Sequence, residues 1–352
     1  MSLPLLQNFI DGRFVPATTD ATFDVVDPRT EQVVAQCPVS GAADVDAAYD
    51  AALKAFESWR LTTPAERQRL LLRLADALEA NADRLVEAQR RNTGQLAEMI
   101  RAEEVMTGAS QLRFFAGAAR LQSGVASGEY AEGLNSQIRR EPIGVVGQIV
   151  PWNYPFMMLI WKVGPALAAG NTVVLKPSAN TPESAIVFAE IAGEILPPGV
   201  FNLVLGTGET GRLMSAHPVP GLVALTGSVR AGSDLAEQAA GNVTRVHLEL
   251  GGKAPAVVFA DEPTGNLDSR ATQQVLKVLR SSVDDFAQSI VMVTHEAEAA
   301  AWADTVLFLR DGRVVAQMDE PDQDRVLEAL HDLGRSEGGA IPGSAGEREP
   351  AL

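Results

Sequence analysis

Short apolar runs, broken by Gly, Asp and Pro, occupy the first forty residues of the chain. Runs of this length that are bounded by turn residues predict β-hairpins. Apolar residues then recur at helical spacing over 43–59. Thr63 and Glu66 form a capping-box pattern around Pro64, which predicts a second helix that continues towards Asn92. The first part of the chain is therefore predicted to contain hairpins followed by helices.

From Pro142 the pattern changes to apolar strands that alternate with amphipathic helices. Five strand-like segments each end in a turn rich in Gly, Pro, Ser or Asn, and they read GVVGQIVPWN, NTVVLKPS, FNLVLG, LVALTGS and RVHLEL. This alternation predicts an α/β fold with a doubly wound parallel sheet. Ligands bind such sheets at the carboxyl ends of the strands, which is where these polar turns fall.

The same alternation continues beyond Phe259. A strand (APAVVFA), a helix over 269–286, a strand (SIVMVTH), a further helix and two strands (TVLFLRDG, RVVAQM) are predicted in that order. Residues 335–352 are rich in Gly, Ser, Pro and Glu, and this composition predicts a disordered tail.

The distribution of charge changes the picture, because it is uneven. The 352 residues carry a formal net charge of −16. Residues 261–352 hold 18 acidic and 8 basic residues, so this quarter of the chain contributes −10 of that charge. Nucleic-acid binding is excluded as a partner class, because phosphate contacts require clustered Lys and Arg. The shift in charge indicates a compositional boundary near residue 260.

The cysteine content and the hydropathy of the sequence indicate the cellular compartment in which the protein is expected. Cys37 is the single cysteine, so an internal disulfide cannot form and a reducing compartment is expected. The amino terminus lacks the pattern of a signal peptide. The longest uncharged stretch, 145–161, contains Gln, Asn and two prolines and is no membrane span. We expect a cytoplasmic protein with no direct membrane insertion and no metal site.

Four motifs stand in order along the larger part of the chain. They are PWNYP at 151–155, WKVGPALAAGNTVVLKPS at 161–178, LVALTGS at 222–228 and LELGGKAP at 248–255. Together they make residues 5–260 resemble the NAD(P)-dependent aldehyde dehydrogenases. The segments RFFAGAAR, SGEYAEG, IRREPIGV, ETGRLM and TGSVRAG bring the likeness closest to the γ-aminobutyraldehyde dehydrogenases. The resemblance implies a dinucleotide-binding domain over residues 1–255.

The resemblance also implies roles for individual residues. Asn153 matches the family's oxyanion donor, Glu249 its general base and Lys176 the lysine that holds the cofactor ribose. The other cofactor-binding positions are Trp152, Ser178, Gly206, Gly211, Thr226, Gly227 and Ser228. Structural alternatives stay open: Asn153 as a plain turn residue, Lys176 and Ser228 as strand-end surface groups, and Glu249 as a solvated acid.

Two departures from the family pattern bear on activity. Ala179 replaces an acid that bonds ribose hydroxyls in many relatives, so binding of NAD or NADP is expected to be weakened and the choice between them stays open. The nucleophilic cysteine should follow Glu249 by roughly thirty to forty residues, but the stretch around 281–286 has none. Cys37 is interpreted as a structural residue. We expect the catalytic domain and the oligomerisation strand to be missing too, which leaves the oligomeric state open and predicts an inactive protein.

The sequence DEPTGNLDS at 261–269 carries a second resemblance. Residues 256–334 resemble the carboxyl-terminal part of an ABC transporter ATP-binding subunit of the lipoprotein or macrolide exporter type. That likeness implies that Asp261 holds Mg²⁺ through water, Glu262 polarises the attacking water, Asp268 lies in the D-loop and His295 senses the γ-phosphate. The chain contains neither a GxxxxGK[ST] phosphate loop nor an LSGGQ signature, so use of ATP and Mg²⁺ is not expected.

The two resemblances meet within residues 253–261. Three hypotheses follow: an inactive aldehyde dehydrogenase-like protein that at most binds NAD(P), a transporter nucleotide-binding subunit, and a composite without enzymatic function. We favour the composite for the whole chain and the first hypothesis for its larger part, whose parent activity is NAD-dependent oxidation of an amino aldehyde to the acid. A recognisable amino-terminal domain is expected, followed by an α/β piece with uncovered apolar surface and strand edges. The sequence leaves open whether the join is natural.

Overall fold

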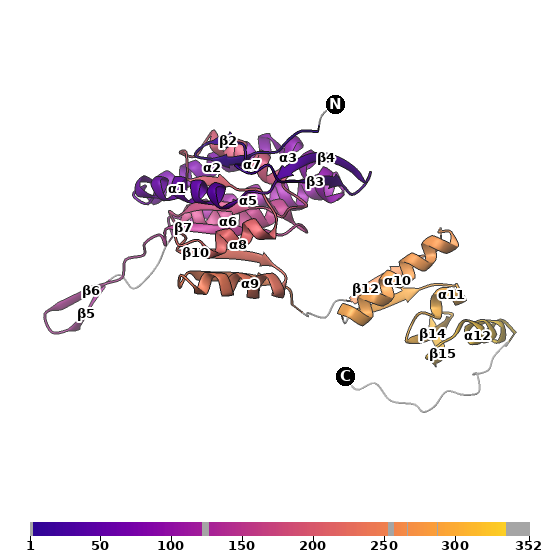
Figure 1. Cartoon of the computed structure of the whole chain (residues 1–352). Helices are drawn as coiled ribbons and strands as arrows, with labels where there is room; N and C mark the ends of the chain where they lie inside the picture. The colour runs from indigo at the N-terminus through magenta and orange to yellow at the C-terminus, as the bar shows by residue number, and fades with distance from the viewer. Residues whose placement is uncertain (1–2, 122–126, 253–256, 266, 287, 336–352) are drawn as a thin grey trace. The chain divides into compact units, whose positions relative to one another are not determined.

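The computed structural model describes residues 3–121, 127–252, 257–265, 267–286 and 288–335. The chain divides into two compact units, residues 1–251 and 252–352. Each unit is described by itself (Figure 1). The division lies close to the predicted boundary after residue 255 and just before residues 253–261, where the two resemblances meet.

A seven-stranded sheet forms the centre of the first unit, with strand order β11-β10-β7-β8-β9-β1-β2. Its strands are β1 (Asn8–Ile10), β2 (Arg13–Val15), β7 (Val145–Ile149), β8 (Thr172–Lys176), β9 (Phe201–Leu203), β10 (Leu222–Gly227) and β11 (Arg245–Leu250). The strands from β11 to β9 run parallel, and β1 joins β9 in the antiparallel sense. The predicted parallel α/β sheet is confirmed.

Helices cover both faces of this sheet. They include α1 (Ala42–Trp59), α6 (Pro155–Ala168), α7 (Glu183–Gly193), α8 (Gly208–Ala216) and α9 (Val229–Ala240). Alternate residues of β8 face opposite layers: Val174 packs in a cluster with Val45 of α1 and Met214 of α8, while Val173 packs with Leu159 of α6. This two-sided burial is why β8 is apolar almost throughout, as expected for a central parallel strand.

A second layer of helices packs on α6 and α7, consisting of α2 (Pro64–Ala80), α3 (Ala82–Thr93), α4 (Ala97–Met99), the π-helix η1 (Ile100–Met106) and α5 (Thr107–Ala118). The capping box is present, since Thr63 Oγ1 accepts from Glu66 N at 3.2 Å and Glu66 Oε2 accepts from Thr63 N at 2.7 Å. The single helix predicted from Pro64 towards Asn92 is wrong. Asn81 interrupts it, because its backbone leaves the helical conformation with φ −104° and ψ 18°, while its backbone N and its Nδ2 both donate to the Ala77 carbonyl at 3.1 and 2.9 Å.

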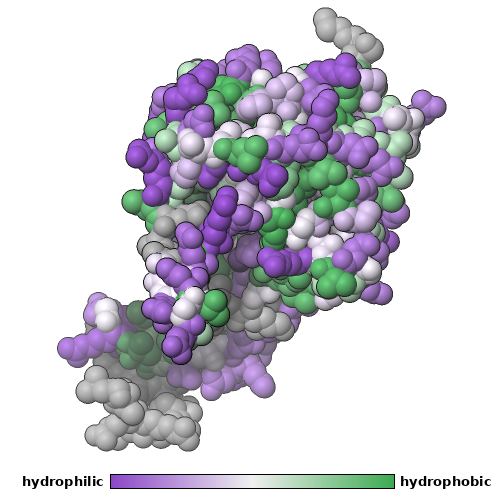
Figure 2. Space-filling model, turned by 90° about the vertical axis from the view of Figure 1, so that its left-hand side faces the viewer, coloured by the Kyte–Doolittle hydropathy of each residue, from purple (hydrophilic) through white to green (hydrophobic). Residues whose placement is uncertain are grey.

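Two hairpins complete the first unit. The strands β3 (Thr22–Asp27) and β4 (Gln32–Pro38) form a predicted amino-terminal hairpin. The strands β5 (Ser127–Ala131) and β6 (Leu134–Gln137) pair in a hairpin that projects from the body of this unit (Figure 1). On the face shown in Figure 2, apolar side chains form small patches separated by polar ones. No helix within the described ranges is long and apolar enough to cross a membrane.

The second unit follows the predicted order of elements in β12 (Val257–Asp261), α10 (Ser269–Phe286), β13 (Ser289–Val293), α11 (Ala297–Ala300), β14 (Thr305–Arg310) and β15 (Arg313–Asp319). A further helix, α12 (Gln323–Arg335), follows them. β12 and β13 are parallel and form a sheet of their own. Phe259 is 79% exposed and Val293 is 58% exposed, so uncovered apolar surface is present as expected. The predicted disordered tail falls outside the described residues, which end at residue 335.

Candidate functional site

The polar turns after the parallel strands of the first unit carry the predicted dehydrogenase site. Because the carboxyl ends of parallel strands meet at one edge of a sheet, residues far apart in sequence gather there. Ordered by the strand that they follow or end, from β7 to β11, these positions are Trp152, Asn153, Lys176, Ser178, Gly206, Gly211, Thr226, Gly227, Ser228 and Glu249. All of them therefore lie at the expected edge.

A cavity of about 850 Å³ brings one group of these residues together. The predicted positions that line it are Trp152, Asn153, Thr226, Gly227, Ser228 and Glu249. Asn153 comes from the turn after β7, whereas Glu249 belongs to β11, and β10 separates these two strands. Glu249 is exposed on the edge strand, with His247 Nε2 at 3.5 Å from its Oε1. The candidate oxyanion donor and the candidate base thus share one cavity.

A second group lies beside the cavity and does not line it. Lys176 is buried at the end of β8, and its Nζ donates to the carbonyl oxygens of Pro177 at 2.8 Å and Gly206 at 3.1 Å. Burial lowers the pKa of Lys176 to about 8. Gly211 lies against this lysine, since a Cβ built on it would be 3.4 Å from Lys176 Cε. Ser178 follows in the next turn and accepts weakly from Asn180 N at 3.4 Å.

Two helix amino termini face this edge of the sheet. Ser228 caps α9 by accepting from Ala231 N at 3.2 Å, and Thr207 caps α8. The amides at a helix amino terminus and the helix dipole favour anions. The backbone is uncrowded at both places, because a Cβ on Gly208 would meet nothing within 4 Å and one on Gly227 would make only ordinary contacts. The arrangement fits a dinucleotide with its pyrophosphate near these termini.

A buried carboxylate holds the helix that follows the Trp152–Asn153 turn. Glu104, on the π-helix η1, is 1% exposed and accepts from the amides of Phe156 at 3.1 Å and Met157 at 3.2 Å. These are the first free amides of α6. Gln89 donates to the same carboxylate and accepts from Phe156 N at 3.2 Å. Burial raises the pKa of Glu104.

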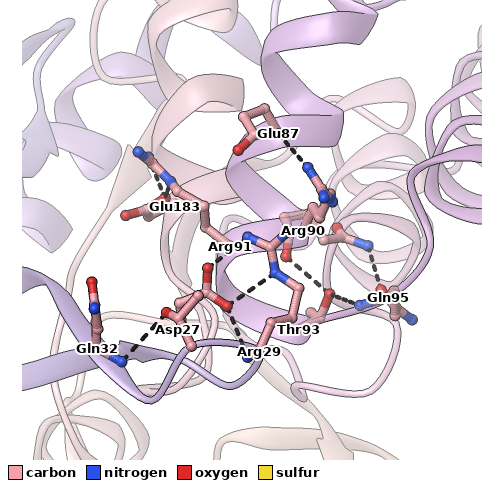
Figure 3. Close-up of polar contacts among 11 residues, drawn as sticks. Asp27, Arg29, Gln32, Glu87, Arg90, Arg91, Thr93, Gln95 and Glu183 are labelled. Atoms are coloured by element: carbon pink, nitrogen blue, oxygen red, sulfur yellow. Dashed lines mark hydrogen bonds and ion pairs between the residues drawn. The ribbon is translucent and has the colours of Figure 1, made fainter.

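The turn is also tied to the end of α3. Gln95 Nε2 donates to the backbone carbonyl of Asn153 at 3.2 Å, and Gln95 Oε1 accepts from Gln89 Nε2 at 3.1 Å. The Thr93 hydroxyl donates to the backbone carbonyl of Gln89 at 2.9 Å and accepts from Gln95 N at 3.3 Å. Figure 3 shows Thr93 beside Gln95. Beside them, Arg91 pairs with buried Glu183 at 2.6 Å, which joins α3 to α7. The position of Asn153 is therefore set by residues that carry no recognisable motif.

A smaller cavity of about 420 Å³ lies on the other side of the same turn. It is lined by residues of β3, the end of α3 and the loop after β8, and shares Trp152 and Asn153 with the larger cavity. Two buried atoms on its wall, Asn92 Nδ2 and Thr181 Oγ1, have no hydrogen-bond partner among the described residues.

Lys162 is a site residue that the sequence analysis missed. It is the only charged residue of α6, is 8% exposed and lines the larger cavity. Burial lowers the pKa of Lys162 to about 8, while the charge of Glu249 acts in the opposite direction. The available signal was a single charge in the otherwise apolar run 155–168.

Cys37 lies in β4, is 1% exposed and does not line either cavity. Burial raises the pKa of its thiol to about 12, so the thiolate form is disfavoured at neutral pH. These properties are those of a packed structural cysteine.

In the second unit the ends of β12 and β13 bring two of the four predicted positions together. His295 Nδ1 and Glu262 Oε1 are 2.7 Å apart, and this carboxylate raises the pKa of His295. Asp261 ends β12, whereas Asp268 accepts from Arg270 N and Ala271 N at 3.0 and 2.8 Å and so caps α10. Among the residues with described positions, no group of three or more His, Cys, Asp or Glu could hold a metal.

Comparison with known proteins identifies the first unit. A profile of the aldehyde dehydrogenase family matches residues 14–282. An aldehyde dehydrogenase of Alternaria alternata is 44% identical over 257 residues, which cover 72% of this chain and 52% of that protein. The crystal structure of PnpE in complex with nicotinamide adenine dinucleotide superimposes with a TM-score of 0.70 at 42% identity and covers 73% of this chain and 53% of that one.

The lengths over which these proteins match bear on the predicted join between the dehydrogenase-like and ABC-like parts of the chain. The chain spans about half the length of the first curated relatives it matches, such as a long-chain-aldehyde dehydrogenase of Acinetobacter at 51%. The family match extends to residue 282, beyond the predicted join at 253–261. An aldehyde dehydrogenase of Deinococcus radiodurans is 35% identical over 358 residues, 97% of this chain and 69% of that protein.

Proposed function

The chain belongs to the aldehyde dehydrogenase family, and from this premise we propose that its first unit binds a nicotinamide dinucleotide without oxidising aldehydes. One observation carries the proposal. The carboxyl ends of the five parallel strands gather a cavity, a buried lysine and two helix amino termini at one edge of the sheet. These are the features that a doubly wound sheet uses to hold a dinucleotide.

Each part of the dinucleotide has a residue of matching chemistry. The amino termini of α8 and α9 suit the pyrophosphate, with Gly227 and Ser228 allowing close approach of the backbone. Lys176 suits the ribose hydroxyls, because the partners of its Nζ among the described residues are two backbone carbonyls that a ligand can replace. The cavity beside Asn153 suits the nicotinamide. When bound, this group supplies a hydride acceptor.

NAD is the form that the relatives support. The PnpE structure contains nicotinamide adenine dinucleotide. Ala179 offers no carboxylate for the ribose hydroxyls next to Lys176. We therefore expect weak binding and a reduced preference for NAD over NADP, since the acid that would repel a 2′-phosphate is absent.

The proposed lack of oxidation rests on the missing thiolate. Asn153, the proposed oxyanion donor, and Glu249, the proposed base, both line the cavity. Neither group can form the covalent intermediate that a cysteine provides. The only cysteine, Cys37, is buried away from the cavity with a raised pKa. The parent activity, by resemblance, is NAD-dependent oxidation of an amino aldehyde to the acid.

We retain an ABC-type origin for residues 256–334. The parallel pairing of β12 with β13 and the 2.7 Å contact between Glu262 and His295 at their ends favour it. Hydrolysis of ATP is not part of the proposal, because the sequence contains no phosphate loop. The family match extends to residue 282, which argues for a dehydrogenase origin of the residues between the predicted join and residue 282. Sequencing the coding DNA across codons 240–275 with its flanks tests whether the join is natural.

Calorimetric titration of the full chain with NAD, NADP and ATP tests the binding proposal. Saturable binding of NAD or NADP is expected, with no NADH formed when an amino aldehyde is added. Lys176→Met should weaken dinucleotide binding about tenfold, the loss of roughly one hydrogen bond to a ribose. Lys54→Met, at an exposed position on α1, serves as the matched control and should bind like the wild type.

Three results would contradict the proposal. Absence of any dinucleotide binding would favour a composite without function. Binding of ATP alone would favour the function of a nucleotide-binding subunit over that of a dinucleotide-binding protein. Aldehyde-dependent formation of NADH would show that a nucleophile other than a cysteine supports oxidation.

A further inference from the structure

Lys162 presents a primary amine to the larger cavity. The residue is 8% exposed and lies on α6, the helix that follows the Trp152–Asn153 turn in the sequence. It lines the larger cavity together with that turn. Among the residues that the structure describes, no carboxylate or carbonyl oxygen bonds its Nζ, although its backbone carbonyl accepts from Gln148 Nε2 at 2.7 Å. A lysine so buried is normally paired, because an isolated ammonium is costly to bury.

The cavity makes the neutral amine accessible. Burial lowers the pKa of Lys162 to about 8, so roughly half of the amine is unprotonated at pH 8. The titratable groups that line the cavity with it are His247 and Glu249, both on β11. A desolvated lysine of lowered pKa is a recognised nucleophile towards carbonyl compounds.

We propose that Lys162 captures an aldehyde in this cavity as a reversible imine. The Nζ lone pair attacks the carbonyl carbon, and the π pair moves to oxygen, which takes a proton from nitrogen to give a carbinolamine. The hydroxyl then leaves as water after protonation, and loss of the second nitrogen proton leaves the carbon–nitrogen double bond. Amine and aldehyde give imine and water, and nothing is oxidised or reduced.

Two neighbours in the cavity support these steps. The side-chain amide of Asn153 is available to donate to the aldehyde oxygen, and the carboxylate of Glu249 is available to hold the proton that moves from nitrogen to oxygen. Phe115, Met158 and Trp161 supply apolar wall. This combination suits a small, uncharged aldehyde.

Lys176 provides an internal comparison. Its pKa is also lowered to about 8 by burial. Its Nζ, however, donates to two backbone carbonyls and does not line the cavity. If a lowered pKa were sufficient, both lysines would react, whereas the proposal requires the cavity and selects Lys162 alone.

Reductive trapping tests the proposal on the full-length chain. The protein is incubated with butanal and cyanoborohydride, which adds hydride to the imine, and the butylated lysines are mapped by peptide mass spectrometry. Lys162 should be labelled at least tenfold faster than exposed Lys54, and Lys176 should stay unlabelled. With cyanoborohydride in excess, so that imine formation limits the rate of labelling, the rate at Lys162 should rise with pH through about 8 and then level.

Variants and competing outcomes complete the test. Lys162→Met and Lys162→Arg should lose the rapid label while Lys54 reacts as before. Labelling of Lys162 in the wild type no faster than Lys54, or equal labelling of Lys176, overturns the proposal without reliance on any variant. The proposal does not depend on dinucleotide binding, so the calorimetric titration and the trapping experiment can fail separately.

Discussion

Removal of the Glu104 carboxylate should destabilise the first unit strongly. In Glu104→Ala, the Met157 amide loses its acceptor, while Phe156 N keeps Gln89 Oε1 at 3.2 Å and Gln89 Nε2 keeps Gln95 Oε1 at 3.1 Å. A buried polar group left unpaired costs about 1–3 kcal/mol. The one amide left unpaired predicts a loss of roughly 1–3 kcal/mol in the free energy of unfolding.

Urea unfolding followed by tryptophan fluorescence measures this loss. Three of the four tryptophans, Trp59, Trp152 and Trp161, belong to the first unit, so the signal reports mainly on it. Glu103→Ala is the matched control, because this neighbouring glutamate is exposed. The control should unfold within about 0.5 kcal/mol of the wild type.

The pH dependence of the same measurement isolates the carboxyl group. Burial raises the pKa of Glu104 above its ordinary value of 4.5, so the folded state binds this proton more readily than the unfolded state. Its contribution to stability is complete below pH 4.5 and decreases as pH rises through the folded pKa. Glu104→Gln should remove this decrease. A Glu104→Ala protein that unfolds within about 1 kcal/mol of wild type would refute the argument that this carboxylate anchors α6.

Other substitutions test the same region and its supports. Gly206→Ala should lower the free energy of unfolding by about 1–3 kcal/mol, because its Cβ would lie 2.0 Å from the Thr210 hydroxyl. Gly211→Ala makes only ordinary contacts and should not lower it. Thermal unfolding compares the two variants, and equal effects would contradict the steric argument. Thr63→Ala should cost about 1 kcal/mol in urea unfolding through loss of the capping box, and no loss would show that the cap is dispensable. Because burial lowers the pKa of Lys176 to about 8, the unfolded state holds its proton more tightly, so stability should rise as pH increases from about 8 to 10.5. This rise should be smaller in Lys176→Met, and an unchanged rise would assign the effect to other groups.

Much of the candidate site was predictable from local patterns. Asn153, Lys176, Ser228 and Glu249 each follow or end an apolar strand, and parallel strands place such residues at one edge of a sheet. Their order in the chain therefore predicted their neighbourhood in space. The structure adds that Lys176 stands apart from the cavity that the other three line.

The supporting residues were not predictable in this way. Glu104 and Gln89 lie on separate helices, and their contact with the first turn of α6 depends on how the helix layers pack. The helix predicted from Pro64 towards Asn92 failed for a related reason. Its periodicity continues through Asn81, but the backbone of that residue leaves the helical conformation and ends α2.

The sequence by itself determined the parallel sheet, the edge at which its polar turns gather and the absence of a second cysteine, because strand alternation and residue identity are local properties. Only the tertiary structure decided that Lys162 is buried beside Glu249 and that Glu104 anchors α6. Burial sets the pKa of Lys162 and Glu104, and burial depends on every element packed around a group. The chemistry of the site therefore follows from packing that no single segment encodes.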